Sequence, residues 1–313
     1  MNVRDRDWHA ADGLAGLVFG VCGEESAAEI VGKVLTRRGA SLVGSGVDIP
    51  DAWALASRVT GELLAPSVRG GVLPAVEIAF RIARGPVVAF AGCESARRSA
   101  DLCARMLQAS GLGTCPCAGF NGSSAPASVL LAAEHARQGD ILVIGVECSD
   151  LEFVMGFRPR VAVVLGSAAS VSVRAADDRS LAEILCRMVE WQGRPDLAIF
   201  SNGFAESHPG LLLGEGRHYR ACVEHPVESG AYLDRGKLRV VGRTDASEGA
   251  LPDLKIDAPQ GDLADVRTVE CVMAAVLAAL EMGASPEAIE RTLRLRSAHR
   301  GRHFFESSPA AAR

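Results

Sequence analysis

A helix–break–strand order that recurs along the chain is the feature that most constrains its fold. Residues 73–93 contain an amphipathic helical pattern, a Gly-Pro break and then the apolar run Val87–Phe90. Residues 180–203 repeat this order, with a Gly-Arg-Pro break before the apolar run Leu197–Phe200. Short apolar runs that follow Gly or Pro are typical of strands buried on both faces of a sheet. We therefore expect an α/β fold in which helices cover a parallel or mixed sheet.

A second pair of segments extends the repetition. Residues 124–147 read as a helix, a glycine stop and a continuous apolar strand. Residues 265–297 begin the same way and offer Thr292–Leu295 as a later strand. This order favours two similar α/β halves, 1–175 and 176–313. A single doubly wound sheet with coincidental similarity stays open as the alternative, because helix–glycine–strand units are common in α/β proteins.

Composition and charge argue against two classes of partner. The chain of 313 residues has a formal net charge of −5, and no run of Lys and Arg is interleaved with aromatic residues, so we expect no nucleic-acid binding. No apolar run approaches the roughly 20 residues of a membrane-spanning helix. The first residues, MNVRDRDWHAADG, lack the apolar core of a secretion signal. We expect a cytoplasmic protein without a membrane segment.

The nine cysteines do not predict a disulfide framework or a metal site. Their number is odd, they are scattered along the chain, and no secretion signal accompanies them. The one close pair is Cys115 and Cys117, whereas a zinc site would need a second ligand pair. His218 and Cys222 stand four residues apart with no further pair beside them. We expect no metal, and most of the cysteines should be small buried side chains.

Cys117 is the cysteine with the strongest claim to chemistry. It lies in GTCPCAGFNGSSAP, just before a helix that we expect to begin near Ser124. A thiol close to a helix N-terminus is favoured as the reactive thiolate. Gly119 permits a sharp turn in which backbone amides could stabilise an oxyanion. The alternative is that Cys117 is a packing residue at a tight turn.

The residues around this turn resemble the ketoacyl-acyl-carrier-protein synthase III family of the thiolase superfamily. The resemblance rests on CAGF, on GDILVIGVECSD and on VAVVLGSAASVSV, and it spans roughly 70–200. It implies an α/β duplicated five-layered αβαβα thiolase-like fold, in which the helices near Ser124 and Asp265 lie back to back. It also implies that Cys117 carries an acyl thioester.

The other catalytic positions of that family hold different residues in this chain. The family's His falls at AIFSNGF, where Asn202 stands, and its Gly-Asn turn falls at Gly261-Asp262. Gly119, Asn202, Gly261 and Asp262 are therefore candidates for oxyanion or turn support. His225, at the end of a short run before Pro226, and His208, in AESHPG, are candidates for the missing base.

Two functions follow from the resemblance. In the first, the chain is an acyltransferase or condensing enzyme in fatty-acid, polyketide or other secondary-metabolite biosynthesis. In the second, it is a catalytically eroded partner subunit of an active ketosynthase. Both imply an acyl-CoA or phosphopantetheinyl acyl-carrier-protein substrate, no tightly bound cofactor, and a homodimer or a heterodimer with a homologous ketosynthase.

Overall fold

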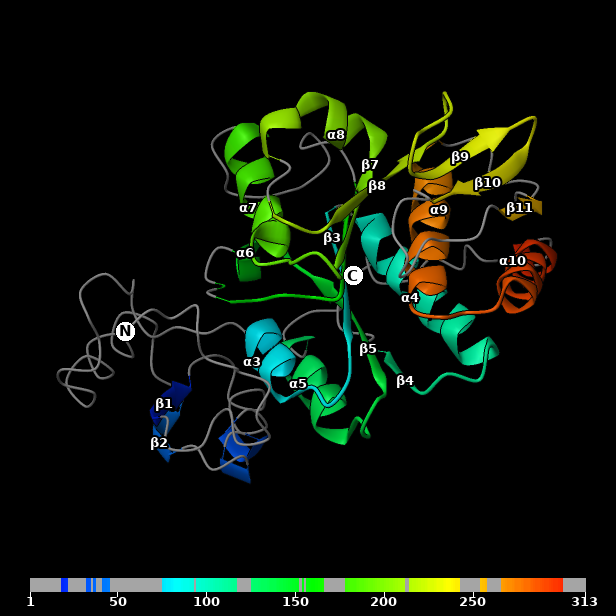
Figure 1. Ribbon diagram of the computed structural model, residues 1–313. Helices are drawn as coiled ribbons and strands as arrows, with labels where there is room; N and C mark the ends of the chain where they lie inside the picture. Colours follow the sequence, from blue (N-terminus) through cyan, green and yellow to red (C-terminus); the bar gives the residue numbers. More distant parts are fainter. Residues whose placement is uncertain are drawn as a thin grey trace, which may run out of the picture.

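One large sheet, covered by helices on both faces, organises the computed structural model (Figure 1). The structure describes residues 18–21, 32–34, 36–37, 41–45, 75–92, 94–116, 125–151, 154, 156–165, 178–211, 214–242, 254–257 and 266–300. In spatial order the nine strands of this sheet are β4 (Thr114–Pro116), β5 (Ile141–Val146), β3 (Val87–Gly92), β6 (Val161–Leu165), β7 (Leu197–Ser201), β8 (Arg217–Cys222), β9 (Gly230–Asp234), β10 (Lys237–Val241) and β11 (Leu254–Asp257).

The strands from β4 to β9 all run in the same direction. At the far edge, β10 is antiparallel to both of its neighbours, β9 and β11. Near the N-terminus, β1 (Val18–Val21) and β2 (Ser41–Ser45) form a separate two-stranded parallel sheet. The apolar runs around 87–90 and 197–200 are therefore strands, as predicted, and they belong to a single parallel sheet.

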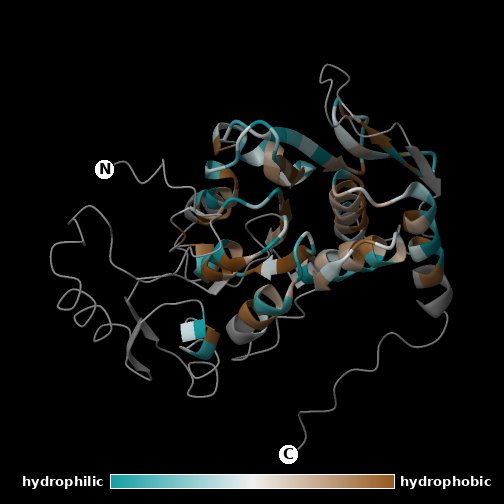
Figure 2. Ribbon diagram, turned by 60° about the horizontal axis from the view of Figure 1, so that its bottom comes forward, coloured by the Kyte–Doolittle hydropathy of each residue, from teal (hydrophilic) through white to brown (hydrophobic). Residues whose placement is uncertain are grey.

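Two layers of helices enclose the sheet. One face is covered by α3 (Ala75–Ile82), α5 (Ala125–His135), α6 (Cys148–Leu151), α7 (Asp178–Glu190) and α8 (Asn202–Ser207). The opposite face is covered by α4 (Glu94–Ala109), α9 (Val266–Glu281) and α10 (Pro286–Arg300). Figure 2 shows hydrophobic colour along the central strands and mixed colour on the surrounding helices. No helix of the described part of the chain is long and apolar enough to span a membrane.

Alternate residues of each central strand enter the two cores. In β3, Ala89 faces the core beneath α3 and α5, whereas Val88 and Phe90 face the core beneath α4 and α9. All three side chains are completely buried. Burial on both faces is what the continuous apolar runs in the sequence reflect, because a strand with one wet face would alternate with polar residues.

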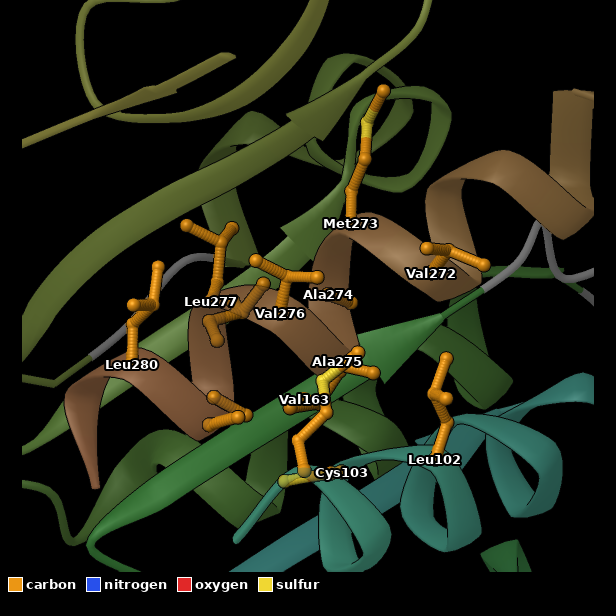
Figure 3. Packing of buried hydrophobic residues seen from close by; sticks show 14 of the residues in the cluster. Leu102, Cys103, Val163, Val272, Met273, Ala274, Ala275, Val276, Leu277 and Leu280 are labelled. Atoms are coloured by element: carbon orange, nitrogen blue, oxygen red, sulfur yellow. The ribbon is translucent and has the colours of Figure 1, made fainter. Parts of the chain in front are cut away.

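Helix α9 is the most deeply buried helix of its layer. It packs against α4 on one side and against β6, β7 and β8 on the other. Figure 3 shows Val272 and Ala275 of α9 near Leu102 and Cys103 of α4 and Val163 of β6. Its burial was predicted from a nearly all-round apolar surface.

The predicted pairing of α5 with α9 is wrong. The two helices lie on opposite faces of the sheet, and α5 packs against α3.

The duplicated five-layered αβαβα fold is also wrong. That fold needs two sheets with helices between them, whereas β6 and β7 pair directly, Val161 opposite Leu197, within one three-layered α/β unit. The division near residue 175 lies outside the described residues and stays a prediction.

The predicted strand Thr292–Leu295 belongs to helix α10. The repeated order of helix, glycine stop and strand suggested a strand here, but the N-terminal signals of a helix prevail. The Ser285 hydroxyl accepts a hydrogen bond from the Ala288 amide at 3.2 Å, and Pro286 occupies the first turn. Arg294 then pairs with Glu290 one turn earlier.

Candidate functional site at the carboxyl edge of the sheet

The topology singles out the carboxyl end of β3. The helix that follows β3, α4, lies on one face of the sheet, whereas α5 and α7, which follow β4 and β6, lie on the other. The connection that leaves β3 therefore crosses one face of the sheet, whereas the connections that leave β4 and β6 cross the other face. In open parallel sheets, ligands bind in the crevice outside the strand ends at such a point. The site is therefore expected among the segments that follow β3 and its neighbours β5 and β6.

The turn from β3 to α4 is short. The strand ends at Gly92 and the helix begins at Glu94, so only position 93 separates them. Gly92 has a φ of +128° and is paired with Leu165 of β6. A side chain at this position would collide with the Leu165 carbonyl oxygen. Gly92 is therefore required by the close approach of β3 and β6.

Two carboxylates follow β5 at the same edge. Glu147 is exposed and is followed directly by helix α6, which contains Asp150. The pKa of Asp150 is raised to about 6, first by burial and then by the charge of Glu147, against a smaller lowering by a hydrogen bond from the Glu147 backbone. Neither carboxylate is paired with an Arg or Lys among the residues that the structure describes.

A second polar group lies at the ends of β7 and β8. The Asn202 amide nitrogen donates to Glu206 Oε1 at 3.0 Å and lies 3.4 Å from His225 Nε2. His225 Nε2 is also 3.4 Å from Glu206 Oε1, and its Nδ1 is 3.2 Å from the Pro226 carbonyl oxygen. These two oxygens stabilise the imidazolium, so the pKa of His225 is raised, with the Pro226 carbonyl as the larger cause.

Asn202 itself is buried, with 3% of its surface exposed, and its side-chain oxygen has no hydrogen-bond partner among the residues that the structure describes. The structure thus brings together two residues that the sequence singled out separately, Asn202 and His225. Glu206 is a third member that the sequence analysis missed.

The other candidates do not join this group. His208 ends α8 and packs its ring against Phe204, with the ring centres 5.2 Å apart. Cys117, Gly119, Gly261 and Asp262 lie outside the described residues, so their roles remain predictions.

Cys115 lies on the edge strand β4 and offers no support for thiolate chemistry. Its pKa is raised, first by burial and then by the charge of Asp140. Cys186, on the buried face of α7, is also a structural thiol, because burial and then the charge of Glu183 raise its pKa to about 12. Within the described ranges, no cluster of three or more His, Cys, Asp or Glu side chains could hold a metal ion. The expected absence of a metal and of a tightly bound cofactor remains a prediction.

Comparison with known structures identifies the fold. The chain has the α/β fold of a Mur ligase: it superposes on MurF from Acinetobacter baumannii with a TM-score of 0.51 at 12% sequence identity, over 92% of this chain and 61% of that one. No family model matches the sequence.

Curated relatives point in the same direction. The chain is 30% identical over 135 residues to the UDP-N-acetylmuramoylalanine–D-glutamate ligase of Nitratidesulfovibrio vulgaris, which covers 43% of this chain and 30% of the ligase. It is 28% identical over 222 residues to the ligase of the same description from Desulfosudis oleivorans, over 70% of this chain and 45% of that one. The chain therefore spans less than half the length of these relatives.

These findings overturn the resemblance to ketoacyl-acyl-carrier-protein synthase III. The curated relatives are UDP-N-acetylmuramoylalanine–D-glutamate ligases, and one nine-stranded, mostly parallel sheet is present where a thiolase-like fold has two sheets. The acyltransferase or condensing activity, the eroded ketosynthase subunit and the place in fatty-acid or polyketide biosynthesis are therefore wrong. So are the acyl-carrier-protein or CoA thioester and the ketosynthase dimer as partners.

The segments on which the resemblance rested are strands of the single large sheet. GDILVIGVE is strand β5 with Glu147 after it, and VAVVL is strand β6. A buried strand that runs directly into an acidic residue, as β5 does, was a usable signal for the site, because polar residues at strand ends collect at one sheet edge.

Proposed function

We propose that this chain serves ATP-dependent amide ligation of the Mur type, as a ligase-fold unit that recognises a nucleotide-linked sugar–amino-acid acid such as UDP-N-acetylmuramoylalanine. The similarity to a D-glutamate ligase over 222 residues carries the proposal, because it extends over 70% of this chain. The shared fold with MurF supports it. The cytoplasmic location expected from the sequence is part of the same proposal.

The ligation class sets what the site must do. Joining a carboxylate to an amine is uphill in water, so ligases couple it to cleavage of a nucleoside triphosphate. The acid must be held where its carboxylate can be activated and then attacked by the amine. The carboxyl edge around β3, β5 and β6 is the place for such a ligand, since it is the switch point of the sheet.

Ligand-induced stabilisation of the purified chain tests the proposal. We expect UDP-N-acetylmuramoylalanine to raise the thermal midpoint in a saturable manner, because a ligand that binds only the folded state stabilises it by mass action. UDP-N-acetylglucosamine, which lacks the lactyl-alanine acid, serves as the control ligand and should raise the midpoint less.

A matched pair of variants locates the binding. Glu147→Gln changes a carboxylate at the carboxyl edge, and Glu190→Gln changes an exposed one at the end of α7, on the opposite edge. We expect only Glu147→Gln to alter the midpoint shift. An equal response to both ligands, or no response to either, contradicts the proposal.

A further inference from the structure

The turn between β3 and α4 occupies the position at which an ATP-dependent ligase needs a phosphate site. A strand–turn–helix at the switch point of a parallel sheet is the setting of the P-loop, G-x-x-x-x-G-K-[ST]. Its glycines let backbone amides surround the phosphates, its lysine reaches the terminal phosphates and its hydroxyl holds Mg²⁺. The residues present in this turn can be compared with that requirement one by one.

The sequence of the turn lacks these groups. Residues 92–99 read Gly-Cys-Glu-Ser-Ala-Arg-Arg-Ser, with one glycine and no lysine. Counted from Gly92, the second glycine and the lysine are replaced by Arg97 and Arg98. Elsewhere in the whole sequence, Gly-Lys occurs at 32–33 and 236–237, followed by Val and Leu rather than Ser or Thr.

The geometry removes the remaining possibilities for a P-loop. Helix α4 has begun at Glu94, so Arg97 and Arg98 lie beyond the helix entrance rather than in a loop around it. Ser99, which would correspond to the hydroxyl that binds Mg²⁺, is only 1% exposed and is part of the interior. Ala96 is also buried, at 3% exposure.

The one glycine of the turn has a structural explanation. Gly92 adopts its positive φ where β3 approaches β6, and a Cβ there would strike the backbone of Leu165. The requirement for glycine at this position therefore comes from the sheet and gives no sign of a bound phosphate.

We infer that this chain neither binds nor hydrolyses ATP, and that within amide ligation it contributes recognition of the acid substrate while another chain supplies the ATP-dependent step. The inference rests on the proposed function for the process it serves. The lack of a phosphate-binding turn stands on the sequence and geometry of residues 92–99 alone.

The experiment measures Mg-ATP binding and ADP release with the full chain. We expect no saturable change in fluorescence anisotropy of a labelled ATP analogue up to about 1 mM ligand, and ADP release equal to the protein-free blank in the presence of UDP-N-acetylmuramoylalanine and D-glutamate. A cooperative thermal transition confirms that the chain is folded. Saturable Mg-ATP binding or ADP release above the blank overturns the inference.

Two arginines of α4 sharpen this test. Arg98 and Arg105 are both exposed and lie two turns apart on the helix, so Arg98→Ala and Arg105→Ala form a matched pair. If Mg-ATP binds to the parent chain and to Arg105→Ala but not to Arg98→Ala, Arg98 takes the role of the P-loop lysine. That result would overturn the inference.

The two proposals fail separately. Stabilisation by UDP-N-acetylmuramoylalanine without ATP binding supports both. ATP binding together with that stabilisation overturns the inference and leaves the proposed function intact. Absence of both responses contradicts the proposed function, and with it the role in acid recognition, and supports only the part of the inference that denies ATP binding.

Discussion

The two edges of the sheet differ in how completely their charged and polar side chains are paired. At the amino edge, buried carboxylates are surrounded by arginines. Asp196 accepts hydrogen bonds from Arg158 Nε at 2.6 Å and from the Gly193 amide at 2.9 Å. Glu281, the last residue of α9, pairs with Arg160 and Arg217 at the starts of β6 and β8. These contacts join strands and helix into one charged network.

At the carboxyl edge the polar groups are less completely paired. Asp150 and Glu147 lie together without an arginine among the described residues, and the Asn202 side-chain oxygen has no partner. The amino edge has comparable atoms in Gln192 Oε1 and in His218 Nε2 near the start of β8, but the amide nitrogen of Gln192 donates to two carbonyl oxygens. Charges that are paired within the protein stabilise the fold, whereas unpaired polar groups at strand ends remain available to a ligand.

The largest effect is expected from Gly92→Ala, which tests whether the β3–α4 turn serves the sheet. The new Cβ would collide with the Leu165 carbonyl, and the positive φ would be strained, so we expect a loss of about 4 kcal/mol in the free energy of unfolding. Urea unfolding measures it. Gly203→Ala, in α8 with no atom within 4 Å of the new Cβ, is the control and should change stability by less than about 1 kcal/mol. Similar losses in both variants would contradict the packing role of Gly92.

The next effect tests the network of the amino edge. Glu281 is 4% exposed, so Glu281→Gln leaves Arg160 and Arg217 without their buried counter-charge. We expect a loss of about 2 kcal/mol, below the full value for a buried pair because both arginines are partly exposed. Glu290→Gln removes an exposed pair with Arg294 on α10 and should cost no more than about 0.5 kcal/mol. If the two variants unfold at the same urea concentration, the amino edge is not a stabilising network.

The sequence predicted the strands well and their assembly poorly. Val87–Phe90 and Leu197–Phe200 were recognisable because a strand buried on both faces must be continuously apolar. Which strands pair is decided by contacts between distant segments, and a local helix–break–strand pattern is the same whether strands form one sheet or two. The strand predicted at Thr292–Leu295 from the same recurring order is wrong, because the cap at Ser285 begins a helix there.

The candidate site was predicted in part. Asn202 was picked because the resemblance placed a catalytic position there, and His225 because it ends a short run before Pro226. The strands that precede them, β7 and β8, end at the same sheet edge. Their contact through Glu206 depends on the parallel pairing of β7 with β8, which the sequence alone did not show. The β3–α4 turn gave no recognisable phosphate signal because the residues that would carry it are replaced.

Asp150→Asn tests the charge of the carboxyl edge. The pKa of this carboxyl rises from an ordinary value of 3.8 to about 6 on folding, so the native state prefers the proton. Ionised Asp150 therefore costs stability, and that cost grows as the pH rises from about 4 to above 6. We expect Asp150→Asn to be more stable than the parent by up to about 3 kcal/mol at pH 8 and nearly equal to it at pH 4, as measured by urea unfolding at both values. A variant that is less stable at pH 8 would show that Asp150 has a stabilising partner.

The smallest effect concerns the polar group of Asn202, Glu206 and His225. The pKa of His225 is raised by the Pro226 carbonyl and by Glu206, so its contribution to stability is present below the pKa of the unfolded chain and is lost as the pH rises through the folded value. We expect Glu206→Gln to lower the pKa of His225, followed by NMR titration of its ring protons. Glu228→Gln, an exposed change in the same β8–β9 connection, should leave the titration unchanged. If neither substitution changes the pKa of His225, the 3.4 Å contact between His225 and Glu206 does not persist in solution. The carboxyl edge would then have one fewer pair of interacting polar groups than the comparison with the amino edge assumes.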